Sequence, residues 1–177
     1  MLVTPNQLFY EQAKKLRWLG IDKDTYKRSK GAYSWEYSVA HVGYKYHMTD
    51  INAAIGIEQL KYLEEDNQKR AKIAHEYKRQ LRNTAGVELY PYQDMKRSSF
   101  HFYPILVENR AALIEHFRAH EIYVGVHYKR NDQYEVYEQT ELPCTDYIDQ
   151  RTLTLPIHVL LKEKEVQFVI DTLKKGW

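Results

Sequence analysis

A polar, aromatic loop leads into a helix in the stretch Gly43-Tyr44-Lys45-Tyr46-His47-Met48-Thr49-Asp50-Ile51-Asn52-Ala53-Ala54-Ile55-Gly56. Thr49 can cap that helix, and Asp50 suits its positive first turn. The run 51–57 is apolar almost all round, which predicts burial on more than one side. Lys45 and His47 come just before the helix start, where an anion would meet charge and free backbone amides.

Helical patterns dominate the sequence on both sides of this stretch. Before it, apolar spacing predicts a short amphipathic helix over 7–19, with Pro5-Asn6 as its start and Gly20 as its stop. The residues from 21 to 46 form a long loop with many aromatic side chains, a kind of loop that is usually functional or packed on a partner. After it, Ile73, Tyr77 and Leu81 mark one face of a long, half-exposed helix that ends near Gly86.

Strand patterns appear beyond a soft seam at Ala85-Gly86. We expect strands at 87–90, 100–107 and 122–126, with a helix capped by Asn109 between the last two and a closing helix around 166–173. Pro104 places the second strand at an edge or a bulge. The fold class is therefore α+β, with long helices followed by a small sheet packed on helices.

One unit accounts for all 177 residues, in two parts: a mostly helical segment 1–85 and a small α+β domain 86–177. Its net charge of +2 is too small for the broad positive field of a protein that binds nucleic acid or an anionic membrane. No apolar run approaches the roughly 18 residues of a membrane span. The single cysteine, Cys144, fits a reducing compartment, and the cytoplasm is the default.

Several catalytic and metal-binding motifs are weak or missing. His116 and His120 have metal-ligand spacing, but Phe117 stands where a zinc protease has glutamate, so we expect a solvated helix face and no metal site. Cys144 lacks a histidine at a nucleophile's spacing. The sequence also lacks the fingerprints of serine hydrolases, P-loop enzymes and dinucleotide-binding enzymes. The aromatic run 100–103 suits core packing better than RNA stacking.

A second polar cluster is Gly125-Val126-His127-Tyr128, where a strand end delivers an imidazole and a phenol to a polar loop. On physical grounds alone, both clusters have a plain alternative reading as surface charge beside a shelf of tyrosines.

The stretch 43–56 closely resembles the signature of the DegT/DnrJ/EryC1/StrS family of pyridoxal-phosphate (PLP) dependent nucleotide-sugar aminotransferases. The stretches 16–25, 59–63, 125–128 and 153–158 agree with the same family in the same order. The resemblance implies the carboxy-terminal part of a fold-type-I PLP-dependent transferase. It also implies that the amino-terminal domain, which carries the Schiff-base lysine, lies upstream and is absent here.

The resemblance assigns roles to four residues. Lys45 corresponds to a position that reaches the cofactor phosphate of the neighbouring subunit across a dimer, and a lysine can serve there as a point charge. His47 lies where arginine or asparagine is common, and His127 with Tyr128 resembles a pair near the sugar-nucleotide pocket. None of the chain's residues takes the catalytic lysine's place, so the chain alone is expected to be inactive.

The function implied is that of one portion of an aminotransferase, which converts a keto nucleotide sugar to an amino sugar with glutamate as amino donor. This portion would complete the active site and the dimer, as a homo-oligomer or with the missing amino-terminal half. The alternative is a non-catalytic remnant of a truncated or split gene that acts as a dimerisation or interaction module. In either case the lone chain is expected to expose apolar surface around 51–57 and 35–37.

Overall fold

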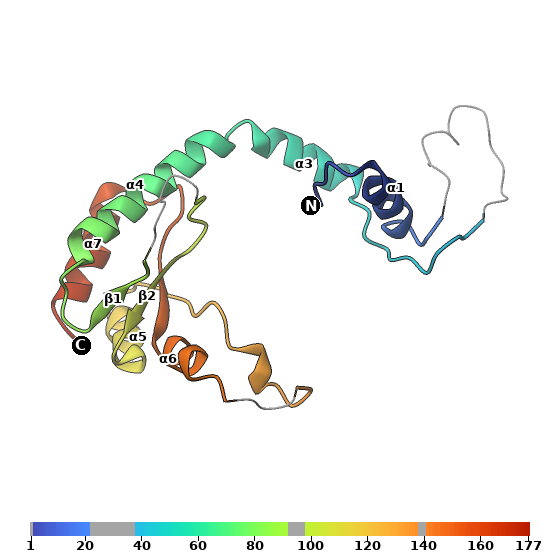
Figure 1. The fold of residues 1–177 in the computed structure, drawn as a ribbon. Coiled ribbons are helices and arrows are strands. Elements are labelled where there is room, and N and C mark those ends of the chain that lie inside the picture. The colour runs from blue at the N-terminus through green and yellow to red at the C-terminus, as the bar shows by residue number, and fades with distance from the viewer. Residues whose placement is uncertain (1, 22–37, 92–97, 138–140) are drawn as a thin grey trace. The chain divides into compact units, whose positions relative to one another are not determined.

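The computed structural model describes residues 2–21, 38–91, 98–137 and 141–177, which form two compact units, Met1–Leu60 and Lys61–Trp177 (Figure 1). The division falls at Leu60, whereas the sequence suggested a seam near Ala85-Gly86. Helix α4 (Leu63–Leu81) packs on the sheet and on α7 (Glu163–Lys174), and therefore belongs with the second unit. The residues 35–37, expected to expose apolar surface, lie outside the described residues.

The first unit contains two described helices, α1 (Gln7–Leu16) and α3 (Asp50–Leu60). Asn6 caps α1, because its side-chain oxygen accepts hydrogen bonds from the amides of Leu8 at 2.9 Å and Phe9 at 3.2 Å. This confirms the expected start of the helix. Helix α1 ends at Leu16, three residues before the predicted end at Leu19.

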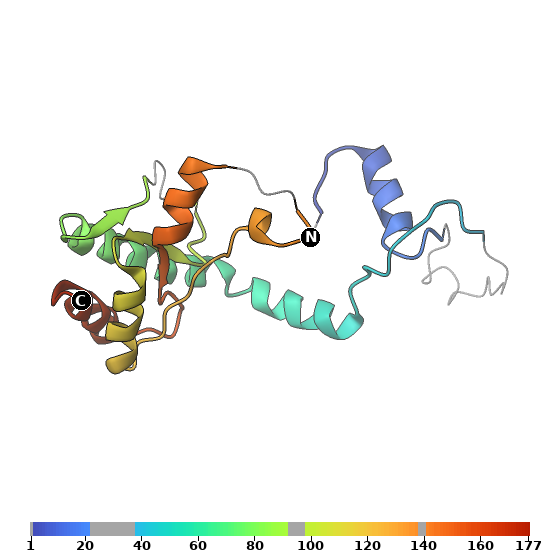
Figure 2. The same cartoon turned by 90° about the horizontal axis from the view of Figure 1, so that it is seen from below.

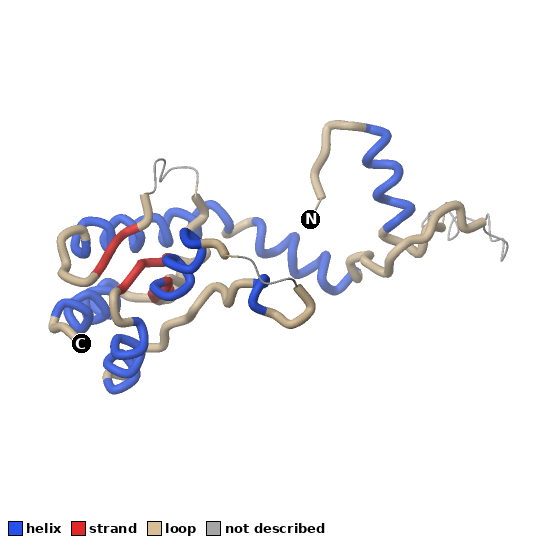
Figure 3. Tube along the Cα trace, turned by 60° about the horizontal axis from the view of Figure 1, so that its bottom comes forward, coloured by secondary structure: helices blue, strands red, loops and turns tan. Residues whose placement is uncertain are grey.

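The second unit follows the α+β pattern expected from the sequence, with helices around a small sheet (Figure 3). After α4, the described elements are β1 (Val87–Leu89), β2 (Tyr103–Val107), α5 (Arg110–Ala119), the 3-10 helix η2 (Asn131–Gln133), α6 (Pro143–Arg151), β3 (Thr152–Leu155) and α7. No helix among the described residues is long and apolar enough to cross a membrane.

The three strands form an antiparallel sheet in the order β1-β2-β3. Side chains alternate between the two faces of a strand. One face carries Tyr103, Ile105, Val107, Leu153 and Leu155, which all belong to the main core. The other face carries Leu106, Thr152 and Thr154 and lies on the side of α6, away from α7 (Figure 2).

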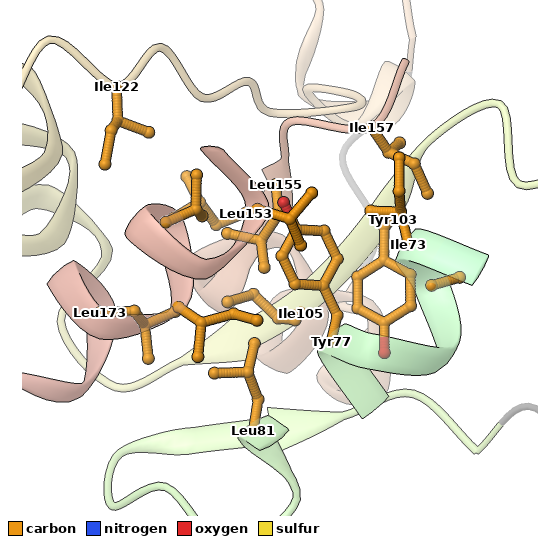
Figure 4. Close-up of a cluster of buried hydrophobic side chains, with 14 of the residues drawn as sticks. Ile73, Tyr77, Leu81, Tyr103, Ile105, Ile122, Leu153, Leu155, Ile157 and Leu173 are labelled. Atoms are coloured by element: carbon orange, nitrogen blue, oxygen red, sulfur yellow. The ribbon is translucent and has the colours of Figure 1, made fainter. Parts of the chain in front are cut away.

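The core lies between the first face of the sheet and the helices α4, α5 and α7 (Figure 4). Tyr77 of α4 and Tyr103 of β2 are fully buried, with ring centroids 5.2 Å apart. The predicted stripe Ile73, Tyr77 and Leu81 belongs to the buried face of α4, so the i, i+4, i+8 spacing identified that face correctly.

Pro104 lies in the central strand of the sheet, whereas the sequence predicted an edge or a bulge at this position. It faces Thr154 on β3, but Thr154 directs both its backbone groups toward Gly125. The nitrogen of Pro104 therefore faces the β1 side, where β1 ends at Leu89 opposite Ile105. The central strand is locally an edge at this position, so the missing N–H interrupts no ladder bond.

The segment 122–126 is not a strand of the sheet, contrary to the expectation. Only Gly125 makes an isolated bridge, to Thr154, in which each residue's N–H donates to the other's carbonyl. The third strand of the sheet is instead β3, which the sequence analysis did not identify as a strand, and which follows the equally unpredicted helix α6.

Substitution of Tyr77 tests the buried hydrogen bond beneath the sheet. Its hydroxyl donates to the carbonyl of Pro156 at 2.7 Å, and burial, with a smaller contribution from Tyr103, raises the pKa of Tyr77 above its ordinary value of 10.0. Tyr77→Phe leaves that carbonyl without its donor, so the free energy of unfolding at neutral pH should fall by about 1–3 kcal/mol.

This cost should depend on pH. Above about pH 10 the unfolded chain releases the phenol proton while the folded chain keeps it, so the contribution of Tyr77 is full below that pH and is lost above it. Urea unfolding of both proteins from pH 8 to pH 11 measures the difference. Tyr123→Phe, at a side chain with 82% exposure, is the control. A cost for Tyr77→Phe that does not change with pH would contradict the assignment.

Candidate functional site

The loop that carries Lys45 is pinned by its backbone to the end of α1. Lys45 forms an antiparallel bridge with Trp18. The amide of Leu19 donates to the backbone carbonyl of Tyr44 at 2.9 Å, and the amide of Tyr46 donates to the backbone carbonyl of Arg17 at 2.9 Å. These backbone bonds flank Lys45 on both sides. The position of its backbone therefore does not depend on its side chain.

Two glycines make this close approach possible. A Cβ on Gly43 would lie 2.0 Å from the nitrogen of Gly20, and a Cβ on Gly20 would lie 1.7 Å from the carbonyl oxygen of His41. Gly20 also has φ of +75°, which disfavours other residues. Gly20 was predicted as a helix stop, but it lies beyond the end of α1, and its role is to admit the second segment.

Lys45 and His47 project from the same side of the extended segment. Side chains alternate along an extended backbone, and Tyr44 and Tyr46 stack on one side with ring centroids 5.0 Å apart. His47 is half-buried against Trp18, edge to face, at 4.1 Å between ring centroids. Its Nδ1 is buried and has no hydrogen-bond partner among the described residues. Lys45 is exposed.

Helix α3 begins directly after this pair. The side-chain oxygen of Thr49 accepts a hydrogen bond from the amide of Asn52 at 3.3 Å, and its carbonyl accepts one from Ala53 at 2.9 Å, which confirms the predicted cap. Asp50 lies in the first turn, as expected. The pair therefore precedes the positive end of a helix dipole by three to five residues in the chain.

Burial of α3 on more than one side, which the sequence predicted, is not found in this chain. None of its residues is buried, and Ile51, Ile55 and Ile57 are 74%, 58% and 65% exposed. A Cβ added to Gly56 would meet nothing within 4 Å. The sequence also predicted that a lone chain would expose apolar surface at 51–57, and the exposed isoleucines of α3 agree with that prediction.

The second predicted pair, His127 and Tyr128, lies in the other unit and lines a pocket of about 240 Å³. Five of its lining residues carry aromatic rings: His101, Phe102, Tyr123, His127 and Tyr128. The remainder come from Gly125 and from β3 and the turn after it, at 154–157. The pocket is thus lined mainly by aromatic side chains with a few polar groups, a composition common in small-molecule sites.

Thr154 orients the imidazole of His127. Its hydroxyl lies 3.0 Å from Nδ1 of His127, and its backbone is fixed by the two bonds with Gly125. The ring of Phe102 stacks on His127 with a centroid separation of 5.8 Å. Since Nδ1 is engaged by Thr154, Nε2 is the nitrogen available to a ligand.

Arg130 anchors the backbone that follows Tyr128. Its buried guanidinium binds the carboxylates of Asp132, with one contact at 2.9 Å, and of Asp146 at the start of α6. The bond from Arg130 holds the pKa of Asp132 below its ordinary value, which keeps the pair ionised. Sequence reasoning did not single out Arg130, although an arginine two residues before an aspartate was visible there.

A profile of the DegT/DnrJ/EryC1/StrS aminotransferase family matches residues 1–174. The UDP-4-amino-4,6-dideoxy-N-acetyl-β-L-altrosamine transaminase of Campylobacter jejuni is 31% identical over 192 residues, which cover 99% of this chain and 49% of that protein. The chain therefore spans about half the length of this curated relative.

Solved structures show the same partial coverage. The sugar aminotransferase CalS13 of Micromonospora echinospora is 30% identical with a TM-score of 0.87, over 99% of this chain and 47% of that one. Spr1654 of Streptococcus pneumoniae, solved in its PMP form, is 26% identical with a TM-score of 0.79, over 98% of this chain and 46% of that one. This coverage is consistent with a carboxy-terminal portion of the fold.

Substitution of Gly125 should move the His127 ring without unfolding the chain. A Cβ at this position would lie 2.7 Å from Cε1 of His127, so in Gly125→Ala the ring must leave its contact with Thr154. Because the clash is with a side chain, the free energy of unfolding should change by less than about 1 kcal/mol.

The histidine Cε1–H resonances in a carbon-proton NMR spectrum report the movement, with His127→Asn used to assign them. Gly56→Ala is the matched control: its Cβ meets nothing, so it should leave the His127 signal in place and stabilise α3 by about 1 kcal/mol. An unshifted His127 resonance in Gly125→Ala would show that the ring does not lie where the structure places it.

Proposed function

Because this chain belongs to the DegT/DnrJ/EryC1/StrS aminotransferase family, we propose that it is the carboxy-terminal portion of a PLP-dependent aminotransferase that makes an amino sugar from a keto nucleotide sugar. Glutamate is the proposed amino donor, and the cytoplasm the proposed compartment. The chain completes an active site whose Schiff-base lysine belongs to another segment or subunit.

The observation that carries the proposal is the exposed Lys45 on a fixed backbone, five residues before the start of α3. A phosphate binds best where a cation and helix amides meet. These residues fit the phosphate end of PLP, and Lys45 would hold that phosphate from the neighbouring subunit of a dimer. The PMP form of the pneumococcal relative supports this type of cofactor.

When bound, the cofactor accepts the amino group from the donor and delivers it to the keto carbon of the sugar. The chain's own residues bind and orient the substrate. His127, held at Nδ1 by Thr154, offers Nε2 to a sugar or nucleotide oxygen, and Tyr128 adds a ring and a hydroxyl to the same pocket. His47 is proposed to contact the substrate from the loop that carries Lys45.

An interaction module without catalysis is the second candidate, favoured by the uncovered apolar face of α3. Both candidates predict a self-associating chain, but only the aminotransferase predicts that a supplied amino-terminal half restores turnover.

The Lys45→Ala variant tests the phosphate role, in an enzyme completed with the amino-terminal half of a relative in trans or by fusion. Loss of one charge-assisted contact of about 1.5–3 kcal/mol should weaken PLP affinity roughly 10- to 150-fold. Thermal stability without cofactor should hold, because the Lys45 side chain is exposed. Lys45→Arg keeps the charge and should retain most of the affinity.

His127→Phe is the matched control in the same enzyme. It should leave PLP affinity unchanged and impair the half-reaction with the keto sugar. Unchanged PLP affinity in Lys45→Ala would remove the cross-subunit role. Failure of any completed enzyme to transaminate would favour the interaction module. When the chain alone is mixed with PLP and reduced with borohydride, the cofactor should not become fixed to one specific lysine.

Charged substitutions on α3 test the self-association. Light scattering over a dilution series should show that the chain associates, and that Ile51→Lys and Ile55→Lys shift it toward the monomer. Leu160→Lys is the control, because Leu160 is at least as exposed, at 79%, but lies in the other unit. A dilution-stable monomer that binds no hydrophobic dye would contradict an apolar docking face on α3.

A further inference from the structure

Two histidines lie one turn apart at the end of α5 and have no part in the proposed function. His116 belongs to the last turn of α5, and His120 is its C-cap residue. Their ring centroids are 4.6 Å apart. Both are half-buried, whereas the sequence predicted a solvated helix face.

The ring of His116 is held by the end of another helix. Its Nε2 lies 3.0 Å from the carbonyl oxygen of Thr172, in the last turn of α7. The last four carbonyls of a helix have no partner within it, and a carbonyl oxygen can only accept. Nε2 of His116 therefore carries the hydrogen, and Nδ1 carries the lone pair.

The ring of His120 is fixed in the same manner. Its Nδ1 lies 2.8 Å from the carbonyl oxygen of His116, which is one of the last carbonyls of α5. Nδ1 of His120 therefore carries the hydrogen, and Nε2 carries the lone pair. Each ring thus donates one N–H to a backbone carbonyl and keeps one nitrogen for a ligand.

We propose that Nδ1 of His116 and Nε2 of His120 form an open binding site for a divalent transition-metal ion of the Zn²⁺, Ni²⁺ and Cu²⁺ class. Metal-binding histidines almost always donate their other ring N–H to a carbonyl or carboxylate, which fixes the tautomer and the ring. Both histidines have this arrangement before any metal binds.

The spacing of the rings suits the ion. Metal-to-nitrogen bonds of about 2.0–2.1 Å at a tetrahedral angle require roughly 3.3 Å between the two nitrogens. The ring centroids are 4.6 Å apart, which is close enough for both rings to reach one ion. Imidazole nitrogen suits Zn²⁺, Ni²⁺ and Cu²⁺, whereas Mg²⁺ and Ca²⁺ prefer oxygen.

The chain supplies two ligands and leaves the other positions to water. Among the described residues, no group of three or more His, Cys, Asp or Glu side chains could hold a metal ion. The carboxylate of Glu115, next to His116, is paired with Arg118 at 2.7 Å. An open site of this kind binds exchangeable ligands, and its affinities should follow the order Cu²⁺ above Ni²⁺ and Zn²⁺, and these above Mn²⁺.

Calorimetric titration of the full chain without an affinity tag tests the site, with Zn²⁺, Ni²⁺ and Cu²⁺ as the probes. A Cys144→Ser background removes the exposed thiol as a competing ligand. One ion should bind per chain, and His116→Gln and His120→Gln should each weaken binding at least tenfold. Glutamine keeps an N–H donor for the carbonyl but offers no imidazole lone pair.

His75→Gln, on an exposed position of α4, and His101→Gln, in the ring-lined pocket, are the controls and should bind as the parent does. Zn²⁺ should raise the melting temperature of the parent and both controls, and should not raise that of His116→Gln or His120→Gln. The metal-free melting temperatures report the separate role of the two rings as partners of helix-end carbonyls.

Three results would overturn the proposal. Binding that survives both glutamine substitutions would place the ion elsewhere. Binding that needs only one of the two histidines would leave no shared site. A chain that binds none of the three ions would leave the histidines with their structural role alone. None of these outcomes depends on aminotransferase activity.

Discussion

The pairing of Thr154 with Gly125 is the constraint on which the second unit depends. Two backbone hydrogen bonds at this point direct the N–H and the carbonyl of Thr154 toward Gly125 and away from β2. This allows Pro104 into the central strand, and it brings the segment 122–128 against β3. The Thr154 hydroxyl then holds His127 in the lining of the ring-lined pocket. One residue thus links the sheet, the crossing segment and the candidate substrate site.

The two candidate pairs are held by different means. Lys45 and His47 are positioned through the backbone, by bonds from the end of α1 and by the close approach of Gly20 and Gly43. His127 is positioned through its side chain, by Thr154 and Phe102. A site held by its backbone tolerates a change of side chain without losing its position, whereas His127 depends on the identity of its neighbours.

Local signals explain what the sequence predicted well. Asn6 and Thr49 cap their helices through bonds to amides two or three residues away, and the stripe of α4 is read from its own spacing. Non-local contacts explain what it missed. The strand character of 122–126 was wrong because only one residue of that segment finds a bridge partner, at Thr154. The contact between Thr154 and His127 joins residues 27 positions apart, so no local sequence pattern reveals it.

The solvated face predicted at His116 and His120 was also wrong because of a non-local contact. The i, i+4 spacing placed the rings together, but their burial comes from α7, whose end meets α5 through the carbonyl of Thr172. That carbonyl needs a donor, because it belongs to the last turn of its helix. The ring that satisfies it is fixed in one tautomer. Helix termination in one element therefore sets the chemistry of a side chain in another, which no reading of α5 alone could have found.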